Sequence, residues 1–293
     1  MSDFSTGWIA APNEVELIVK EQAIPFFFQT PAAEVDTIPP EVFLWRYKEK
    51  ITGKPWPNRD QGGVGSCVSF GTVAAIEATM CFEIANGESE EVRDLCQEVV
   101  YAGSRVEIGG NRIQGDGSVG AWAAQFVKDY GVLDRAVYGS YDLTRYDEVR
   151  CRAWGRKGVP DDLEPAVKKH PIKAITMVRS WDDAKKSLAS GYGIAICSNQ
   201  GFERIRDSAG FAKPSGRWAH CMALLGYQTG SREGGWICNS WGDRFHSGPV
   251  GAGAPTCGFW ADADIIERML KAEDSWAFSS LEGFPARKID WII

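Results

Sequence analysis

The sequence predicts an α+β fold, with helices concentrated in the first half of the chain and strands in the second half. The clearest helix runs from Cys67 to about Ala85, a strongly apolar stretch that ends before Gly87. Short apolar runs separated by glycine and polar residues begin at Ile172, as expected for buried strands. A glycine-rich turn, residues 61–66, leads directly into the long helix and places Cys67 in its first turn.

The chain divides into three expected parts. Residues 1–35 form an N-terminal extension, and residues 36–272 form the main domain, with a helical lobe at about 36–140 and a strand lobe at about 166–272. A polar connector at 141–165 joins the two lobes, and an aromatic-rich C-terminal tail occupies residues 273–293. Besides the long helix we expect helices at 121–132, 181–190 and 262–272, and strands at 172–178, 193–197, 218–227 and 236–242.

The composition is that of a globular protein, since 44% of the 293 residues are apolar and 24% are charged. The net charge of −7 argues against a nucleic-acid partner, whose recognition needs a basic surface. No apolar run approaches the roughly 18 residues of a membrane span, so no membrane partner is expected. None of the eight cysteines belongs to a Cys-x-x-Cys pair, so we expect neither a metal nor another cofactor.

Cys67 carries the chemistry that the sequence predicts. The N-terminal end of a helix bears a partial positive charge, which favours a thiolate and lowers the cysteine pKa from its free value of about 8.5. A thiolate is a nucleophile, and catalysis also requires a base, for which the chain offers three histidines. His170 and His246 stand in polar segments and are interpreted as solvated loop residues, which leaves His220 as the candidate base.

His220 is the one imidazole in an apolar run, 218–227, that predicts a buried strand. Taken alone, such a residue is more often a core histidine than a catalytic one. A second short strand ends in Asn239, and two adjacent antiparallel strands would bring Asn239 beside His220, where an amide oxygen can fix the imidazole tautomer. Asn239 alone is typical of a strand end and Gln61 alone of a surface amide, so only their combination with Cys67 indicates a catalytic site.

The order Gln61, Cys67, His220 and Asn239 resembles that of the papain-like cysteine peptidases (C1 family). Residues 239–242, Asn-Ser-Trp-Gly, are similar to the family's motif at its catalytic asparagine, and residues 58–62 are similar to the segment with its oxyanion-hole glutamine. Residues 115–118, Gly-Asp-Gly-Ser, and the helix after them are more similar to prokaryotic and phage-encoded members. The resemblance implies a papain-like two-lobe fold, with a helical N-terminal lobe, an antiparallel, barrel-like C-terminal lobe, and the active-site cleft between them.

The same resemblance implies a cysteine endopeptidase that cleaves peptide bonds through a thioester acyl-enzyme. Cys67 would be the nucleophile, His220 its general base and acid, and Asn239 the residue that orients His220. Gln61 and the backbone N–H of Cys67 would form the oxyanion hole. The implied partner is a peptide or protein substrate, and the termini could dock on a larger assembly. The implied substrate-binding residues are Gly115, Asp116, Gly117, Ser118 and Trp241.

Three departures from the family pattern keep an alternative open. Val64 replaces a cysteine that usually forms a disulfide, Val68 replaces an aromatic residue, and a Gly/Pro-rich insertion at 247–258 replaces a second Trp-Gly. The alternative is a papain-like fold that serves as a structural or interaction protein, for example in a phage particle, with impaired or incidental activity. A peptidoglycan amidase fits less well, because such enzymes lack the Gln-Gly and Asn-Ser-Trp-Gly patterns.

The N-terminal extension is short for a pro-region of this family, although residues 17–24 could cover a groove. It has no basic region before an apolar run, so no secretory signal is expected. We therefore expect a cytoplasmic protein, or a virion component if a phage encodes it. In that setting all eight cysteines should be free thiols.

Overall fold

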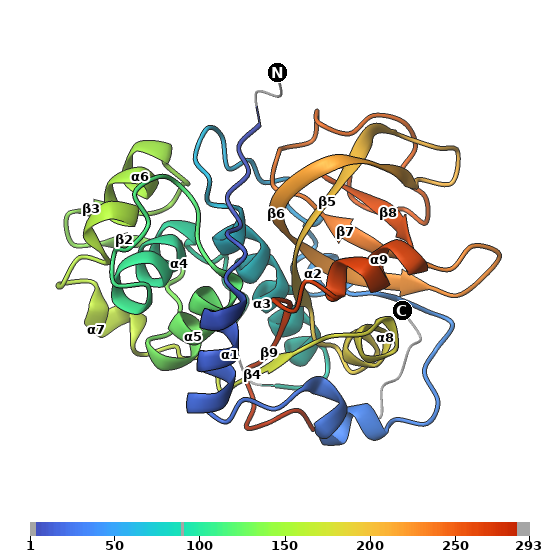
Figure 1. The fold of residues 1–293 in the computed structure, drawn as a ribbon, viewed down its shortest axis with the longest axis horizontal. Coiled ribbons are helices and arrows are strands. Elements are labelled where there is room, and N and C mark those ends of the chain that lie inside the picture. Colours follow the sequence, from blue (N-terminus) through green and yellow to red (C-terminus); the bar gives the residue numbers. More distant parts are fainter. Residues whose placement is uncertain (1–3, 89–90, 286–293) are drawn as a thin grey trace.

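The computed structural model describes residues 4–88 and 91–285, which form two lobes that lie side by side (Figure 1). One lobe is helical, and the other is built on an antiparallel sheet. The long helix α3 (Cys67–Ala85) lies where the lobes meet, and the N-terminal segment runs along the same boundary (Figure 1). The predicted two-lobe α+β fold is therefore confirmed.

Helix α3 begins and ends where the sequence predicts. Most positions of this helix are apolar, and its residues from Cys67 to Glu83 are buried on all sides. Ala78 and Phe82 belong to the core beneath the sheet, whereas Val73 belongs to the core of the helical lobe. Among the described residues, α3 is the one helix long and apolar enough to cross a membrane, but protein encloses it, as expected for a core helix.

The helical lobe also contains a short hairpin and one turn of π-helix. Within it, α1 packs against α5, and α4 packs against α6. Its elements are α1 (Pro12–Glu21), α4 (Gln97–Gly103), the π-helical turn η3 (Ser104–Ile108), α5 (Gly120–Asp129), β2 (Val137–Tyr138), β3 (Tyr141–Asp142), α6 (Glu148–Lys157) and α7 (Glu164–Val167).

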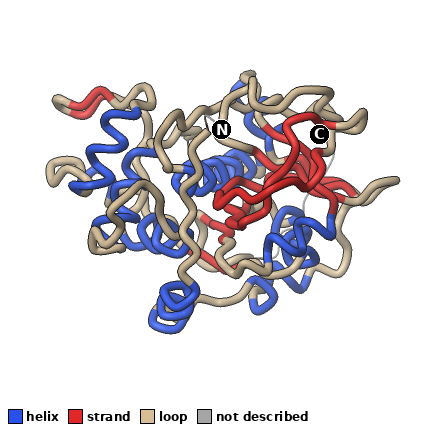
Figure 2. The backbone as a smooth tube through the Cα atoms, turned by 45° about the horizontal axis from the view of Figure 1, so that its top comes forward, coloured by secondary structure: helices blue, strands red, loops and turns tan. Residues whose placement is uncertain are grey.

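The other lobe contains a seven-stranded sheet with the order β4-β9-β5-β6-β7-β8, and β1 pairs with β6. Figure 2 shows these strands gathered in one half of the molecule. The long strands β5 and β6 pair with several register shifts, which bend the sheet. The elements are β1 (Glu41–Phe43), β4 (Ala174–Met177), β5 (Ile194–Arg206), β6 (Ala212–Gln228), β7 (Gly234–Cys238), β8 (Gly258–Asp262) and β9 (Trp276–Ser279), with helices α2 (Trp45–Thr52), α8 (Trp181–Ala189) and α9 (Ala263–Leu270) and the 3-10 turns η1 (Phe27–Gln29) and η2 (Pro31–Glu34).

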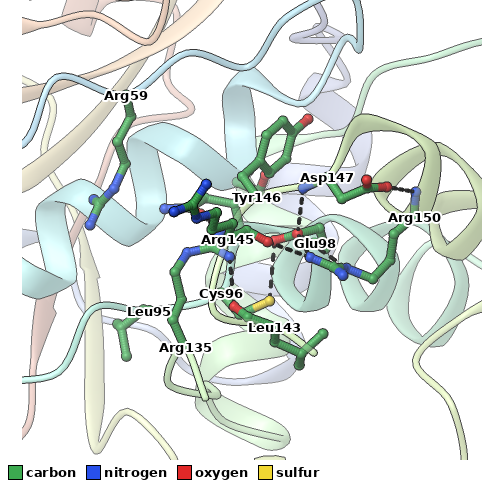
Figure 3. Close-up of polar contacts among 12 residues, drawn as sticks. Arg59, Leu95, Cys96, Glu98, Arg135, Leu143, Arg145, Tyr146, Asp147 and Arg150 are labelled. Atoms are coloured by element: carbon green, nitrogen blue, oxygen red, sulfur yellow. Dashed lines mark hydrogen bonds and ion pairs between the residues drawn. The ribbon is translucent and has the colours of Figure 1, made fainter. Parts of the chain in front are cut away.

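Residues 141–165 are a folded part of the helical lobe and not a plain connector. Arg150 of α6 donates to the buried carboxylate of Glu98 in α4, with Nη2 and Oε1 2.7 Å apart (Figure 3). Arg135 pairs with the same carboxylate at 2.9 Å, and the N–H of Asp147 donates to it at 3.0 Å (Figure 3). The prediction of a polar connector is therefore wrong at Arg150, because the sequence does not reveal the buried acid, Glu98, that pairs with it.

The chain returns to the sheet after α9, within the region expected to be a tail. β9 lies between β4 and β5, and its residues are buried on both faces of the sheet. Trp276 and Phe278 face the core of the helical lobe, whereas Ala277 faces the opposite core. A strand buried on both faces lacks the alternation that marks a strand in a sequence. Trp291, the remaining aromatic residue of the predicted tail, lies outside the described residues.

Candidate active site

Cys67 is the first residue of α3 and is completely buried. The turn before it is tied to the sheet lobe, since the N–H of Gln61 donates to the carbonyl oxygen of Ser240 at 2.8 Å. Gly62 in this turn has φ of +61°, a conformation that glycine adopts without strain. The glycine-rich turn therefore delivers Cys67 to the boundary between the lobes.

His220 and Asn239 lie on neighbouring strands and are hydrogen-bonded to each other. β6 pairs with β7 in the register that sets Ala223 opposite Cys238, which brings the residue after β7 toward His220. His220 Nε2 donates to Asn239 Oδ1 over 2.9 Å, and Trp241 stacks on the imidazole with ring centroids 4.3 Å apart. Nδ1 of His220 has no hydrogen-bond partner among the described residues. The contact predicted from the two strands is present.

The side chain of Gln61 is buried and links the two lobes. Its Oε1 accepts a hydrogen bond from Ser240 Oγ at 2.6 Å. Its Nε2 donates to the carbonyl oxygens of Val64 at 2.8 Å and Ser5 at 3.0 Å. The hydroxyl of Tyr146 donates to the Gln61 carbonyl oxygen at 3.1 Å. The Gln61 NH2 group is therefore a fixed donor at the lobe boundary.

Residues 4–9, which we call the covering segment, cross the site between the two lobes (Figure 1). The N–H of Gly7 donates to the carbonyl oxygen of Ala219, the residue before His220, at 3.0 Å. On the helical side, Ser118 N–H donates to Gly7 O at 2.8 Å and Ile9 N–H donates to Ser118 O at 2.9 Å. The covering segment therefore occupies the backbone groups at both edges of the site.

Close packing and three side-chain contacts hold the covering segment in place. A Cβ atom at Gly7 would lie 2.0 Å from the carbonyl oxygen of Gly65, so only glycine fits there. The indole of Trp8 donates to Asp274 at 2.7 Å.

The expected covering role of residues 17–24 is wrong in position, since most of them form α1 on the surface of α5.

Two contacts come from Trp241, which was expected to bind substrate. Its indole N–H donates to the carbonyl oxygen of Ser5 at 2.9 Å, and its ring meets that of Phe4 with centroids 5.7 Å apart. Together with its stacking on His220, these contacts make Trp241 the floor on which the start of the covering segment lies. Its predicted role in substrate binding stays a prediction.

Burial controls the protonation of Cys67 and His220 in this covered site. Burial raises the pKa of Cys67 above its usual value, and the N–H groups of Cys221 and Gly7 only partly offset this effect. Burial also lowers the pKa of His220 to about 4, against the opposing hydrogen bond with Asn239. The sequence predicts a lowered thiol pKa, which is wrong for the covered site because burial outweighs the backbone hydrogen bonds that favour the thiolate.

The predicted substrate-binding segment 115–118 is fixed by a buried arginine. The guanidinium of Arg105 donates to the carbonyl oxygens of Gly115 at 2.7 Å, Gly117 and Gly155 at 2.6 Å. Nothing in the sequence indicates this role, because a single arginine does not reveal which distant carbonyl groups it contacts.

Asp116, in the middle of the same segment, contacts the turn before Cys67. Its Oδ2 accepts a hydrogen bond from the N–H of Gly65 at 3.2 Å and lies 3.6 Å from Arg152 Nη2. The structure therefore gives Asp116 a contact with the turn that leads to Cys67. Its contact with a substrate stays a prediction.

The two histidines set aside in the sequence differ in their surroundings. His246 is buried, so its interpretation as a solvated loop residue is wrong, and its Nε2 lies 3.4 Å from Asn239 Nδ2. The polar residues and the insertion that flank His246 concealed this position. His170 is half-buried, and its Nε2 accepts a hydrogen bond from Arg93 at 2.9 Å.

All eight cysteines are free thiols, as the sequence predicts. Val64 and Val68 are fully buried in apolar clusters, so the Cys67 turn is packed without the family's usual disulfide and aromatic residue. In residues 4–88 and 91–285, no group of three His, Cys, Asp or Glu side chains could hold a metal ion.

A thiol hydrolase needs a nucleophilic sulfur, a base and a donor for an oxyanion. Cys67, His220 and Gln61 are the groups at this boundary that could supply them, so fold and site define the class of two-lobe cysteine hydrolases. The sequence profile of the "Papain family cysteine protease" family matches residues 39–249, and the chain therefore belongs to the papain family.

Individual relatives agree with this assignment. The chain is 33% identical over 111 residues to Cysteine proteinase 1 of Entamoeba histolytica, a match that spans 37% of this chain and only 32% of that protein. The solved structure of xylellain, a cysteine protease from Xylella fastidiosa, superimposes with a TM-score of 0.66 at 19% identity, over 96% of this chain and 97% of that chain. Procathepsin L 3 of Tenebrio molitor gives 0.53 at 14% identity, over 91% and 79%. At these identities the structures support the fold alone.

Proposed function

We propose that this chain is a cysteine peptidase that hydrolyses peptide bonds through Cys67, His220 and Asn239. The observation that carries the proposal is the 2.9 Å hydrogen bond between His220 and Asn239 under the ring of Trp241, beside the helix that begins with Cys67. One nitrogen of this imidazole is fixed by an amide and the other has no hydrogen-bond partner among the described residues. Such an imidazole can exchange a proton through its unpartnered nitrogen.

In the proposed reaction the Cys67 sulfur attacks the carbonyl carbon of a peptide while the thiol proton passes to His220. Gln61 Nε2 and the Cys67 N–H donate to the oxyanion that forms. The C–N bond then breaks as His220 gives its proton to the leaving amine, and a thioester remains on Cys67. Water attacks the thioester with His220 as the base, which releases the acid and restores the thiol.

The covering segment has to leave before a substrate can bind. It occupies the Gln61 donor through the Ser5 carbonyl oxygen, and it occupies Ser118 and Ala219 through Gly7. We therefore propose that the described conformation is a resting form with a dry site and a protonated thiol. Departure of the segment would rehydrate the site and move both pKa values toward the thiolate–imidazolium pair that the sequence predicts.

We also propose, from the sequence, that the chain is of the prokaryotic or phage type, that it is cytoplasmic, and that it docks on a larger assembly through its termini. The alternative, a structural or interaction protein, differs from the peptidase in the reactivity of the uncovered thiol. That difference can be measured without knowing the substrate.

Gly7→Val should uncover Cys67, because a side chain at position 7 collides with the backbone of Gly65. Iodoacetamide labelling at pH 5.5, mapped to each cysteine by mass spectrometry, measures the result. Cys67 of the unaltered chain should label slowly. In the variant it should label about a hundredfold faster than a free cysteine, which is only about 0.1% thiolate at that pH. Gly230→Val is the matched control, since nothing lies within 4 Å of a Cβ at that position.

A chain without residues 1–9 tests the same point if Gly7→Val folds poorly. Both uncovered forms should cleave an unfolded protein such as reduced casein, and adding Cys67→Ser should abolish the cleavage. If uncovered Cys67 labels like a free thiol, and His220→Ala leaves its rate unchanged, the structural alternative replaces the peptidase.

A further inference from the structure

His246 lies on the side of Asn239 opposite His220. His220 takes the oxygen end of the Asn239 amide at 2.9 Å, and Nε2 of His246 lies 3.4 Å from the nitrogen end. An amide NH2 group can only donate, so His246 Nε2 must accept and its proton must reside on Nδ1. We propose that His246 is a positioning residue that fixes the orientation of the Asn239 amide, so that its oxygen faces the catalytic histidine. The inference rests on the proposed function.

The orientation matters because the two ends of an asparagine amide have nearly the same shape and opposite chemistry. With the oxygen toward His220, the amide holds the proton of Nε2 and stabilises an imidazolium. With the NH2 group toward His220, that group and the Nε2–H of His220 would face each other as two donors. The N–H of Ser240 also donates to Asn239 Oδ1, at 2.8 Å. Among the described residues, His246 is the acceptor found for the other end of the amide.

The surroundings of His246 hold its ring in place. The imidazole packs between the rings of Phe245 and Phe259, with centroids 4.7 and 4.5 Å away. The next residue, Ser247, pairs with β5, since its N–H donates to Arg204 O and its carbonyl accepts from Arg206 N–H, both at 2.9 Å. A side chain held by its backbone and by two aromatic rings can position a neighbour.

Burial, assisted by nearby positive charges, keeps His246 in the neutral form that the contact needs. Burial is the largest cause that lowers its pKa, to about 3, and the positive charges of Arg206 and Arg204 and the nearby His220 act in the same direction. The guanidinium of Arg206 is itself held by the carbonyl oxygens of Gly258 at 2.6 Å and Gly248 at 2.8 Å, at the two ends of the insertion. The insertion thus contributes to the cationic surroundings of His246, and the acceptor nitrogen stays unprotonated above about pH 4.

The test compares two variants of similar size in the Gly7→Val chain. His246→Gln keeps an acceptor oxygen near the position of Nε2, whereas His246→Leu has none. His246→Leu should lower kcat about tenfold with KM nearly unchanged, and His246→Gln should restore most of the loss. When the rate of Cys67 labelling is plotted against pH, the basic limb of the curve reports the loss of the proton from the His220 imidazolium. This limb should shift to lower pH in His246→Leu and should stay in place in His246→Gln. In an Asn239→Ala chain, His246→Leu should have no further effect on that limb.

Nuclear magnetic resonance of 15N-histidine in the otherwise unaltered chain gives a readout that needs no turnover. The Nε2–H signal of His220 should persist in His246→Gln and broaden or vanish in His246→Leu. Equal profiles and signals in both variants and the parent would overturn the proposal. So would equal losses in both variants, which would assign His246 to packing alone. If the signal behaves as expected and no peptide is cleaved, the positioning role stands and the peptidase proposal fails separately.

Discussion

At the residue scale, the contacts that hold the Gln61 amide in the covered site would also hold it in the proposed open site. Ser240 and Val64 hold the two ends of its amide, and neither contact involves the covering segment. In the covered site the Ser5 carbonyl oxygen takes the remaining donor at 3.0 Å. An oxyanion in place of that oxygen would meet a donor that is already oriented, which is the condition for strong electrostatic stabilisation.

Gln61→Ala in the Gly7→Val chain should therefore lower kcat about 10²–10³-fold, or about 2.7–4 kcal/mol, with little change in KM. Ser240→Ala is the matched comparison, since it removes one support of the amide and leaves the donor. The loss of transition-state stabilisation in Ser240→Ala should be about 1 kcal/mol. Steady-state kinetics on one peptide measures both variants. Losses of equal size would show that Gln61 acts through packing and not as an oxyanion donor.

At the scale of elements, the π-helical turn η3 connects the core of the helical lobe to the edge of the site. Arg105 in this turn has no carboxylate partner among the described residues, and backbone carbonyl oxygens take the place of one. Ile113 supplies a further carbonyl oxygen at 3.2 Å. A buried cation bound in this way fixes the backbone around it, because each carbonyl that moves leaves charge unsolvated. Segment 115–118 should therefore be rigid.

Arg105→Met should lower the unfolding free energy by about 2–4 kcal/mol, since it leaves several buried carbonyl groups unpaired. Urea unfolding measures this loss, and hydrogen exchange should show faster exchange at the amides of residues 115–118. Arg156→Met, an exposed site on α6, is the control and should change stability by less than about 0.5 kcal/mol. Unchanged exchange at 115–118 in Arg105→Met would contradict a positioning role for the arginine.

The elements that the sequence predicts well are those with a continuous apolar pattern. Helix α3 has the predicted bounds because a glycine-rich turn precedes it and Gly87 closely follows it. β5 and β6 extend past the predicted runs, through exposed residues 203–205 and 213–217. These residues belong to a bulged hairpin formed by the two strands, and the one large apolar residue among them, Ile205, is exposed. Cross-strand pairing of polar residues leaves no periodic signal in one strand alone.

At the scale of the whole molecule, the catalytic candidates were easier to predict than the residues that cover or support them. Cys67 begins a recognisable helix, His220 lies within a recognisable strand, and Asn239 directly follows another strand. The covering segment depends on contacts between distant parts of the chain, such as that of Trp8 with Asp274, which are separated by 266 positions. Neither residue carries a pattern that names its partner. The covered state could therefore not be predicted from the residues that form it.

Asp274 joins three parts of the molecule through one buried carboxylate. It accepts hydrogen bonds from Trp8 of the covering segment at 2.7 Å, from Trp276 of β9 at 2.8 Å, and from the N–H of Gly120 at the start of α5 at 2.8 Å. Burial nevertheless raises its pKa to about 6, because the three donors only partly offset the loss of water. The charged form therefore costs the folded state free energy near neutral pH.

This cost gives Asp274 a defined effect on stability. Between the unfolded pKa of 3.8 and the folded pKa of about 6, the folded protein binds the proton more tightly, so the Asp274 contribution to stability grows as pH falls through this window. Urea unfolding of the parent and of Asp274→Asn at pH 7 and pH 4 isolates the Asp274 contribution to the unfolding free energy. The contributions of the other titrating groups cancel when the free energy of the variant is subtracted from that of the parent. The parent should gain about 2 kcal/mol relative to the variant at pH 4. For Glu98→Gln the change should be opposite, so that the parent loses stability relative to the variant as the pH falls. The reason is that the arginines beside Glu98 hold its pKa below the usual value despite burial. A parent-to-variant difference for Asp274→Asn that does not change with pH would mean that this carboxylate titrates in the folded protein as it does in the unfolded chain.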